Sequence, residues 1–291
     1  MRIINNIALK QNKKDMLSLQ YCARHYYNFA EYLNYISWLI CILTTVVFTL
    51  PPVTEMLGSY KVIWIVIINL LAIVIDVFYG KLIQIGAACK MLFDYKLFNF
   101  SEVSNYQGLT LEKIYQQVAK TIMRYKKSYE SQINNRGIDK IKGVKDWYYN
   151  ISKDLSHEEA VRECQKQNLN FDIQLIKRTV FLYVFLFVII IILLIIFDVN
   201  TPLITILINI SAGFALIKKM ISVFWKLGKL ILHNQIIEDV SQYKNVDLIM
   251  IQKMIDNRRI VCVSIPNFMH KINLLRIHRE IDISTSMDVM I

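Results

Sequence analysis

The stretch that decides the fold is residues 179–217, which read TVFLYVFLFVIIIILLIIFDVNTPLITILINISAGFALI and hold one charged residue, Asp198. A helix needs about 20 apolar residues to cross the roughly 30 Å hydrocarbon core of a bilayer. Core helices of soluble proteins carry polar residues along one face. The stretch therefore predicts a hairpin of two transmembrane helices, Thr179–Phe197 and Val199–Ile217.

A second apolar hairpin precedes the first in the chain. Residues Asn34–Thr54 carry no charge, and Val62–Tyr79 carry only Asp76 near their end. We therefore expect four transmembrane helices in two hairpins, separated by about a hundred polar residues.

The charges of the chain predict its orientation. Lys and Arg number 34 against 23 acidic residues, and the excess lies outside the apolar runs and their two short turns. By the positive-inside rule this excess faces the cytoplasm, so we expect both termini and the middle region to be cytoplasmic. The expected segments are a cytosolic N-terminal helix (1–33), transmembrane hairpin 1 (34–79), a cytosolic helical region (80–178), transmembrane hairpin 2 (179–217) and a cytosolic C-terminal region (218–291).

The polar segments carry the apolar spacing of helices, so the chain is predicted to be an all-α membrane protein. Its cytosolic domain combines the middle region with the C-terminal tail. Ser156 followed by Glu159 fits a capping box, and Thr110 precedes an expected helix over 111–134. Further helices are expected over 7–33, 80–98, 223–240, 247–257 and 267–282, and one short strand over 260–263.

Signatures of enzymes are missing from the sequence. It contains no Gly-rich phosphate loop, no G-x-S-x-G, no H-E-x-x-H and no Cys-x-x-Cys. The five His residues are dispersed, and the five Cys are odd in number and scattered. We therefore expect no catalytic residues, no metal, no cofactor and no disulfide framework.

Polar residues inside the apolar runs are candidates for lining a pore. Asn69 and Asp76 share one face of the second run, and Thr205, Asn209 and Gly213 recur every four residues in the fourth. Such groups need a partner or water within a bilayer. They either line a polar path when protomers assemble or pack between the helices of one unit, and Asp76 is close enough to the cytoplasmic interface to reach water.

Short motifs in the polar segments carry a family resemblance. They are Lys10-Gln11-Asn12, Asp146-Trp147-Tyr148, Cys164-Gln165-x-x-Asn168-Leu169-x-x-Asp172, Ile251-Gln252, Asp256-Asn257-Arg258-Arg259, Ile265-Pro266-x-Phe268 and Arg279-Glu280. With the two hairpins, their order resembles the SMODS- and SLOG-associating four-transmembrane effector family. One departure is at Lys90-Met91, where that family usually shows Gln-Glu before Phe-Asp, so no role of that pair is carried over.

The resemblance implies a function. Members are encoded beside cyclic-oligonucleotide synthases in bacterial antiphage operons and are regarded as pore-forming effectors. It implies an effector in the bacterial inner membrane that a cyclic oligonucleotide triggers to oligomerise or open and permeabilise the membrane. The partners would be the lipid bilayer, that second messenger and further copies of the chain, without DNA or RNA.

The motif residues also suit nucleotide recognition, because phosphates bind Arg and Lys, and bases stack on aromatic rings. The candidate ligand-binding residues are Arg136, Trp147, Tyr148, Gln165, Asn168, Asp172, Arg258 and Arg259. Alternatively, these residues form a structural network that ties the cytosolic helices together, or the arginines contact lipid headgroups. Two other functions stay open: a constitutive channel or transporter subunit, and a membrane anchor that recruits a cytosolic partner.

Overall fold

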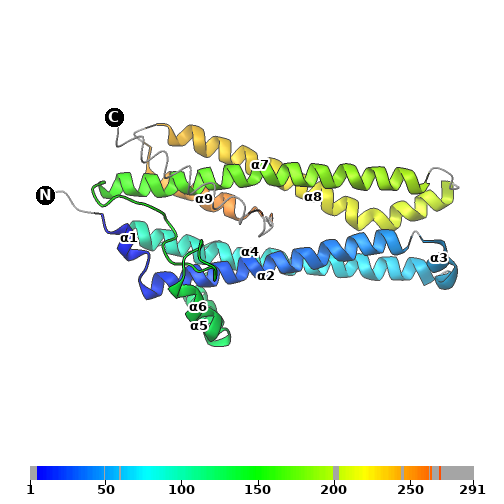
Figure 1. Cartoon of the computed structure of the whole chain (residues 1–291), viewed down its shortest axis with the longest axis horizontal. Helices are drawn as coiled ribbons and strands as arrows, with labels where there is room; N and C mark the ends of the chain where they lie inside the picture. The colour runs from blue at the N-terminus through cyan, green and yellow to red at the C-terminus, as the bar shows by residue number, and fades with distance from the viewer. Residues whose placement is uncertain are drawn as a thin grey trace.

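The computed structural model describes residues 5–48, 50–58, 60–198, 203–243, 246–261, 263 and 269. Its helices are α1 (Ile7–Lys10), α2 (Lys14–Val47), α3 (Pro51–Leu57), α4 (Tyr60–Phe98), α5 (Leu111–Arg124), α6 (Lys126–Asn134), α7 (His157–Asp198), α8 (Leu203–Ser241) and α9 (Leu248–Arg259). Figure 1 shows two long helical hairpins side by side, α2 with α4 and α7 with α8. The all-α prediction is confirmed for the described residues, which contain two isolated β-bridges and no strand.

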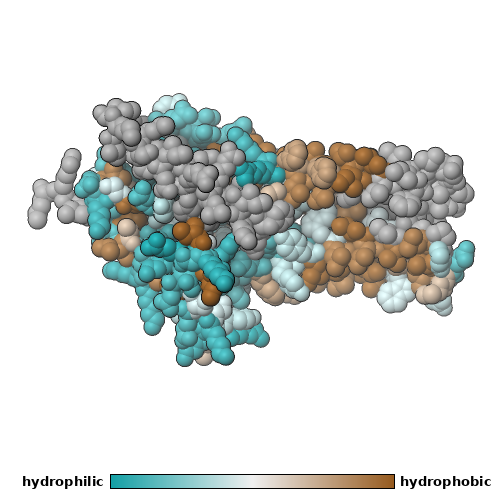
Figure 2. Space-filling view, viewed as in Figure 1, coloured by the Kyte–Doolittle hydropathy of each residue, from teal (hydrophilic) through white to brown (hydrophobic). Residues whose placement is uncertain are grey.

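Three of the long helices run without interruption from a polar end of the molecule to an apolar end. Helix α4 has 39 residues, α7 has 42 and α8 has 39, so each is roughly 60 Å long at 1.5 Å per residue. Figure 2 shows hydrophilic residues gathered at one end of the described surface and hydrophobic residues along the other. The helices expected over 80–98 and from the Ser156 cap therefore continue without a break into the second and third apolar runs.

The apolar end exposes large side chains on several helices. Ile63, Leu70 and Val77 of α4 and Phe185 of α7 are each between 54% and 57% exposed. Within the described residues, α4 alone is long and apolar enough to cross a membrane, with a mean hydropathy of 2.6 over its most apolar 18 residues. The first and fourth predicted spans include residues outside the described set, and the third includes side chains outside it.

Helix α2 begins and ends at positions that differ from the sequence prediction. The expected helix over 7–33 breaks after Lys10, because the side chains of Gln11 and Asn12 bind the loop before α7. At its other end α2 stops at Val47 instead of Thr54. Pro51 explains this stop, since its ring would clash with the carbonyl of the residue four positions earlier in a helix.

The expected helix over 111–134 is divided at Tyr125. This residue leaves the helical region at φ −120° and ψ 39°, and its ring packs on His25 with 4.4 Å between ring centroids. The bend lets both α5 and α6 contact α2. Tertiary packing therefore overrides a continuous helical pattern at this position.

The predicted helix starts are confirmed where local capping decides them. Thr110 Oγ1 accepts a hydrogen bond from the Lys113 backbone N–H. In the capping box, the Ser156 N–H donates to Glu159 Oε2 at 2.8 Å and the Glu159 N–H donates to Ser156 Oγ at 3.3 Å.

The expected strand over 260–263 is wrong at the three of its positions that are described. The expected helix over 267–282 lies, apart from Met269, outside the described residues.

The largest hydrophobic core forms at the polar end of the molecule, where α2 and α4 pack closely. A Cβ atom at Gly86 would lie 3.2 Å from the Tyr27 ring and 3.3 Å from the Ala23 carbonyl oxygen, so glycine sets the helix separation here. Beyond Gly86, the residues of α4 from Ala87 to Tyr95 are all buried. This buried stretch positions Lys90 and Asp94 inside the core at the polar end.

Candidate functional site

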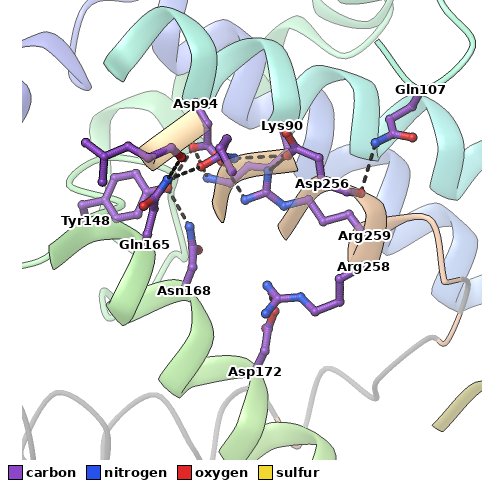
Figure 3. A network of polar contacts seen from close by, with 12 residues as sticks. Lys90, Asp94, Gln107, Tyr148, Gln165, Asn168, Asp172, Asp256, Arg258 and Arg259 are labelled. Atoms are coloured by element: carbon purple, nitrogen blue, oxygen red, sulfur yellow. Dashed lines mark hydrogen bonds and ion pairs between the residues drawn. The ribbon is translucent and has the colours of Figure 1, made fainter. Parts of the chain in front are cut away.

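A buried polar network joins α4, α7, α9 and the loop before α7 (Figure 3). At its centre Asp94 of α4 has a fully buried side chain. Its Oδ1 accepts a hydrogen bond from the Tyr148 hydroxyl at 2.8 Å. Its Oδ2 lies 2.7 Å from Arg259 Nη2 and accepts a bond from Gln252 Nε2 at 3.3 Å. A buried carboxylate is costly unless it is paired and hydrogen-bonded, so these contacts hold Asp94 in place.

Helix α9 supplies one face of the network. Gln252, Asp256 and Arg259 follow each other by four and three residues, which places them on one side of the helix. Arg259 Nη1 lies 2.8 Å from Asp256 Oδ1, so the guanidinium bridges the carboxylates of Asp256 and Asp94. Asp247 starts α9 by accepting a hydrogen bond from the Ile249 backbone N–H at 2.9 Å, which sets the register of this face.

Helix α7 contributes Gln165, Asn168 and Asp172. Gln165 Nε2 donates to the Leu248 carbonyl at 2.9 Å, and Asn168 Nδ2 donates to the Tyr148 hydroxyl at 2.7 Å. Asp172 forms an ion pair with Arg258. These contacts join α7 to α9 and to the loop at three successive points.

Arg258 adds α8 to the network. Its side chain is 3% exposed, and its Nη1 donates to Asn234 Oδ1 of α8 at 2.9 Å. The alternative in which this arginine contacts lipid headgroups is therefore wrong, because its guanidinium is buried between protein groups. Arg258 ties three helices together.

The loop before α7 is held by the break between α1 and α2. Gln11 Oε1 accepts from the Tyr148 N–H at 2.9 Å, and Gln11 Nε2 donates to the Tyr148 carbonyl at 3.0 Å. Asn12 and Asp146 make a similar reciprocal pair. The motif over residues 10–12 thus fixes the Tyr148 hydroxyl beneath Asp94.

The last two predicted ligand-binding residues lie at the edge of the network. Arg136 pairs with Asp146 at 2.8 Å, and its side chain is 57% exposed. Trp147 is 45% exposed and its ring lies over Lys90, with 4.1 Å from Nζ to the ring centroid. The Lys90 Nζ also faces the rings of Phe93 and Tyr148, so aromatic surfaces surround this buried cation.

Burial perturbs the ionisable groups of the network. Burial lowers the pKa of Lys90 to about 7, although the nearby Asp94 carboxylate acts in the opposite direction. Burial alone would raise the pKa of Asp94, but the positive charges of Lys90 and Arg259 outweigh it and hold that pKa below its ordinary value. Burial raises the pKa of Asp256 to about 6. Lys90 and Asp256 therefore titrate close to neutral pH.

Three buried polar atoms of the network have no hydrogen-bond partner among the described residues: Lys90 Nζ, Gln165 Oε1 and Asp256 Oδ2. Each such atom costs about 1–3 kcal/mol. The network is thus held by strong ion pairs and weakened by incomplete hydrogen bonding. This balance suits a contact that has to come apart.

Six of the eight predicted ligand-binding residues gather in this network, but their side chains bind one another. Sequence reasoning missed four central members: Lys90, Asp94, Gln252 and Asp256. A signal for Asp94 was present, because a lone carboxylate within the apolar run Met91-Leu92-Phe93 requires a buried partner. Whether any of the eight contacts a ligand stays a prediction.

At the membrane end, Asp76 has partners on two other helices. Its Oδ1 lies 2.9 Å from Lys219 Nζ of α8 and accepts a hydrogen bond from Ser37 Oγ of α2 at 3.0 Å. The Lys219 side chain is only 6% exposed, whereas that of Asp76 is 49% exposed. This ion pair joins the two hairpins at the boundary between the predicted spans and the polar end.

The other pore-lining candidates are only partly described. The Oδ1 of Asn69 is buried without a hydrogen-bond partner among the described residues. The side chains of Thr205 and Asn209 lie outside the described set. Gly213 lies one turn after Asn209 and faces α2. A Cβ atom on Gly213 would lie 3.5 Å from Thr45 Cγ2. At Gly213, the face of α8 that carries Thr205 and Asn209 therefore packs against α2 of the same chain.

The chain matches a known protein family over most of its length. The SMODS-associating 4TM effector domain matches residues 5–215, which run from before α1 to the middle of α8. The chain belongs to this family. The family name describes a multi-pass membrane effector with four transmembrane helices, associated with SMODS nucleotide signalling, in agreement with the four apolar runs.

The family match contains Asp94, Tyr148 and the α7 residues of the network, whereas α9 lies beyond it. No curated protein and no solved structure matches the chain.

Proposed function

We propose that this protein senses a cyclic oligonucleotide in the cytosol and then permeabilises the bacterial inner membrane, by oligomerising or by opening. The observation that carries the proposal is the buried network around Asp94. It joins α4, α7 and α8, the helices that continue into the predicted spans, through one short cytosolic helix, α9. A signal that displaces α9 would act on both hairpins at once.

In the resting arrangement, Arg259 holds α9 to α4, and Arg258 holds α9 to α7 and α8. The Lys219–Asp76 pair holds the hairpins together at the membrane boundary. A ligand shifts such an arrangement only by its differential affinity for the two states. Moving the equilibrium from 1:99 to 99:1 requires about 5.5 kcal/mol of differential binding, which is comparable to the cost of breaking one or two buried ion pairs.

The proposal contains no bond-breaking step and no cofactor. It places both termini in the cytoplasm and takes further copies of the chain as partners in the open state. Thr205 and Asn209 remain the proposed lining of the polar path, with Asn69 and Asp76 on the second span.

Proteoliposomes loaded with carboxyfluorescein test the function. The full chain is reconstituted in phosphatidylethanolamine and phosphatidylglycerol, and cyclic di-AMP, cyclic di-GMP, cyclic GMP–AMP and cyclic tri-AMP are added in turn. We expect dye release with at least one of these and none without nucleotide.

Other outcomes favour the alternatives. Release that is independent of every nucleotide would indicate a constitutive channel. Nucleotide binding without any release would indicate an anchor that recruits a partner. If the protein neither binds any of the nucleotides nor releases dye, the proposal is overturned.

A further inference from the structure

A cavity lies between α4 and α9, apart from the eight residues predicted to bind ligand. Its volume is about 450 Å³, within the roughly 300–1,000 Å³ that ligand pockets occupy. Four of its lining residues carry side-chain amides: Gln84, Asn105, Gln107 and Asn257. Met91 and Ile260 supply apolar surface, and none of the described residues that line the cavity is acidic.

A tight turn forms one wall of the cavity. Tyr106 and Leu109 exchange two backbone hydrogen bonds of 2.8 and 3.0 Å, with Gln107 at φ 54° and Gly108 at φ 85° between them. The φ of Gly108 is a backbone conformation that residues with a side chain rarely adopt, so glycine suits this turn beside Gln84 of α4. The wall is therefore a built feature, because its backbone conformation depends on these residues.

The amides are oriented by bonds within the wall. Gln84 Nε2 donates to the Gln107 carbonyl at 2.7 Å, and Gln107 Nε2 donates to the Asp256 carbonyl at 3.0 Å. Within the described part of the chain, their Oε1 atoms have no hydrogen-bond partner, and neither has the Asn257 amide. Acceptors and donors are thus left available beside apolar side chains.

This combination suits a nucleobase. An amide group presents donor and acceptor in one plane, and pairs with the donor and acceptor edge of a base. The apolar side chains of Met91 and Ile260 can cover a flat ring. Lys81 and Lys253 are exposed and lie one helical turn before Gln84 and Asn257, where ammonium groups would meet a phosphate.

The cavity is connected to the buried network. Gln107 binds the backbone of Asp256, whose carboxylate binds Arg259, which binds Asp94. Asn257 lies in sequence between Asp256 and Arg258. A molecule that pulls on Asn257 therefore acts directly on the helix that holds α4, α7 and α8 together.

We infer that this cavity binds one nucleobase of the signal, read by Gln84, Gln107 and Asn257, with Lys81 and Lys253 facing the adjoining phosphates. The inference rests on the proposed function and adds the place where the signal acts. Residues of the buried network then transmit binding and do not contact the ligand.

Calorimetry on the detergent-solubilised full chain tests the site with the same four cyclic nucleotides. Asn257→Ala removes an exposed amide without a partner among the described residues, so the fold should be retained. Asn170→Ala on α7 is the matched control, since Asn170 is also an exposed helical asparagine away from the cavity. We expect Asn257→Ala to weaken binding about tenfold or more and Asn170→Ala to leave it unchanged. Lys253→Ala should weaken binding more at low salt than at high salt.

The outcomes separate this inference from the proposed function. Wild-type protein that binds a nucleotide and releases dye, with unchanged affinity in Asn257→Ala, would overturn the cavity and leave the proposed function intact. An equal loss of affinity in Asn170→Ala would also overturn the cavity, because the loss would not be specific to it. Wild-type protein that neither binds any of the four nucleotides nor releases dye would overturn both.

Discussion

Lys90 is an unusual residue to find at the centre of a buried network. It is 3.7 Å from the Asp94 carboxylate, too far for a hydrogen bond, and its remaining neighbours are aromatic rings. The nearby Asp94 carboxylate offsets part of the cost of burying this cation. Replacing a whole buried ion pair by apolar side chains is often neutral or stabilising, whereas removing one partner leaves the other charge uncompensated. After the loss of Lys90, Asp94 would keep the Arg259 guanidinium as its ionic partner.

Lys90→Met removes a buried cation, and its effect on the free energy of unfolding should depend on pH. The folded state has a Lys90 pKa of about 7 against 10.5 for the ordinary side chain. Below pH 7 the Lys90 amine is protonated in both the folded and the unfolded wild-type protein, so the folded state carries the full cost of burying a charge. This cost falls as pH rises from 7 towards 10.5, because Lys90 then loses its proton in the folded state. The stability of Lys90→Met relative to wild type should therefore be highest at pH 6 and lower at pH 9.5. Thermal unfolding of both proteins in detergent measures this. Lys145→Met, at an exposed position, should show no such trend; a constant difference for Lys90→Met would contradict the buried cation.

The Arg258–Asp172 pair predicts how the resting arrangement fails. Asp172→Asn removes the charge that compensates a guanidinium only 3% exposed, at a cost of about 2 kcal/mol. If the pair holds α9 to α7, the variant should release dye from proteoliposomes without nucleotide, whereas Asp239→Asn on the exposed face of α8 should not. Unchanged nucleotide dependence in Asp172→Asn would show that this pair does not hold the resting state.

At the scale of elements, α4 packs along α2, and Gly86 marks one of their close contacts. Gly86 permits that contact, whereas Gly80, six residues earlier on the same helix, has no neighbour within 4 Å of a Cβ position. Everything that α4 adds to the network lies within three turns after Gly86.

Gly86→Val should lower the free energy of unfolding by about 1–3 kcal/mol, because the added side chain forces α4 away from Tyr27 and the Ala23 carbonyl. Gly80→Val, the same change on the same helix, should have little effect. Denaturant unfolding of the two variants in detergent measures the difference. Equal stabilities would mean that α2 and α4 can separate at no cost.

The sequence predicted those elements whose ends depend on neighbouring residues. The Ser156–Glu159 capping box and the Thr110 cap are local, and both are formed as expected. The break after Lys10 and the bend at Tyr125 were missed, because their causes lie more than a hundred residues away in the first case and across α2 in the second. For the same reason Asp94 was missed: its partner Arg259 lies at the far end of the chain.

At the scale of the molecule, the arrangement places the polar network and the apolar surface at opposite ends of the same helices (Figures 1 and 2). The family name implies four membrane spans, and the distribution of Lys and Arg predicts their direction. The direction is open to experiment.

Reporter fusions at residue 1, at Asn135 and at Ile291 should all report cytoplasm, because basic residues crowd these segments. Alkaline phosphatase should be inactive and green fluorescent protein bright at each site, while insertion of alkaline phosphatase next to Glu55 should give activity. A periplasmic signal from the Asn135 fusion would refute the two-hairpin topology.

The position of Lys219 within α8 has a mechanical consequence. Sixteen residues of the helix precede it and twenty-two follow it, which corresponds to arms of roughly 24 and 33 Å at 1.5 Å per residue. If the ion pair with Asp76 acts as a fulcrum, a displacement of the cytosolic tip reaches the far tip reduced to about three quarters and with the force raised in proportion. A lever of these proportions gives a smaller displacement and a larger force at the membrane end of α8. Such an output suits the separation of tightly packed apolar helices over a short distance.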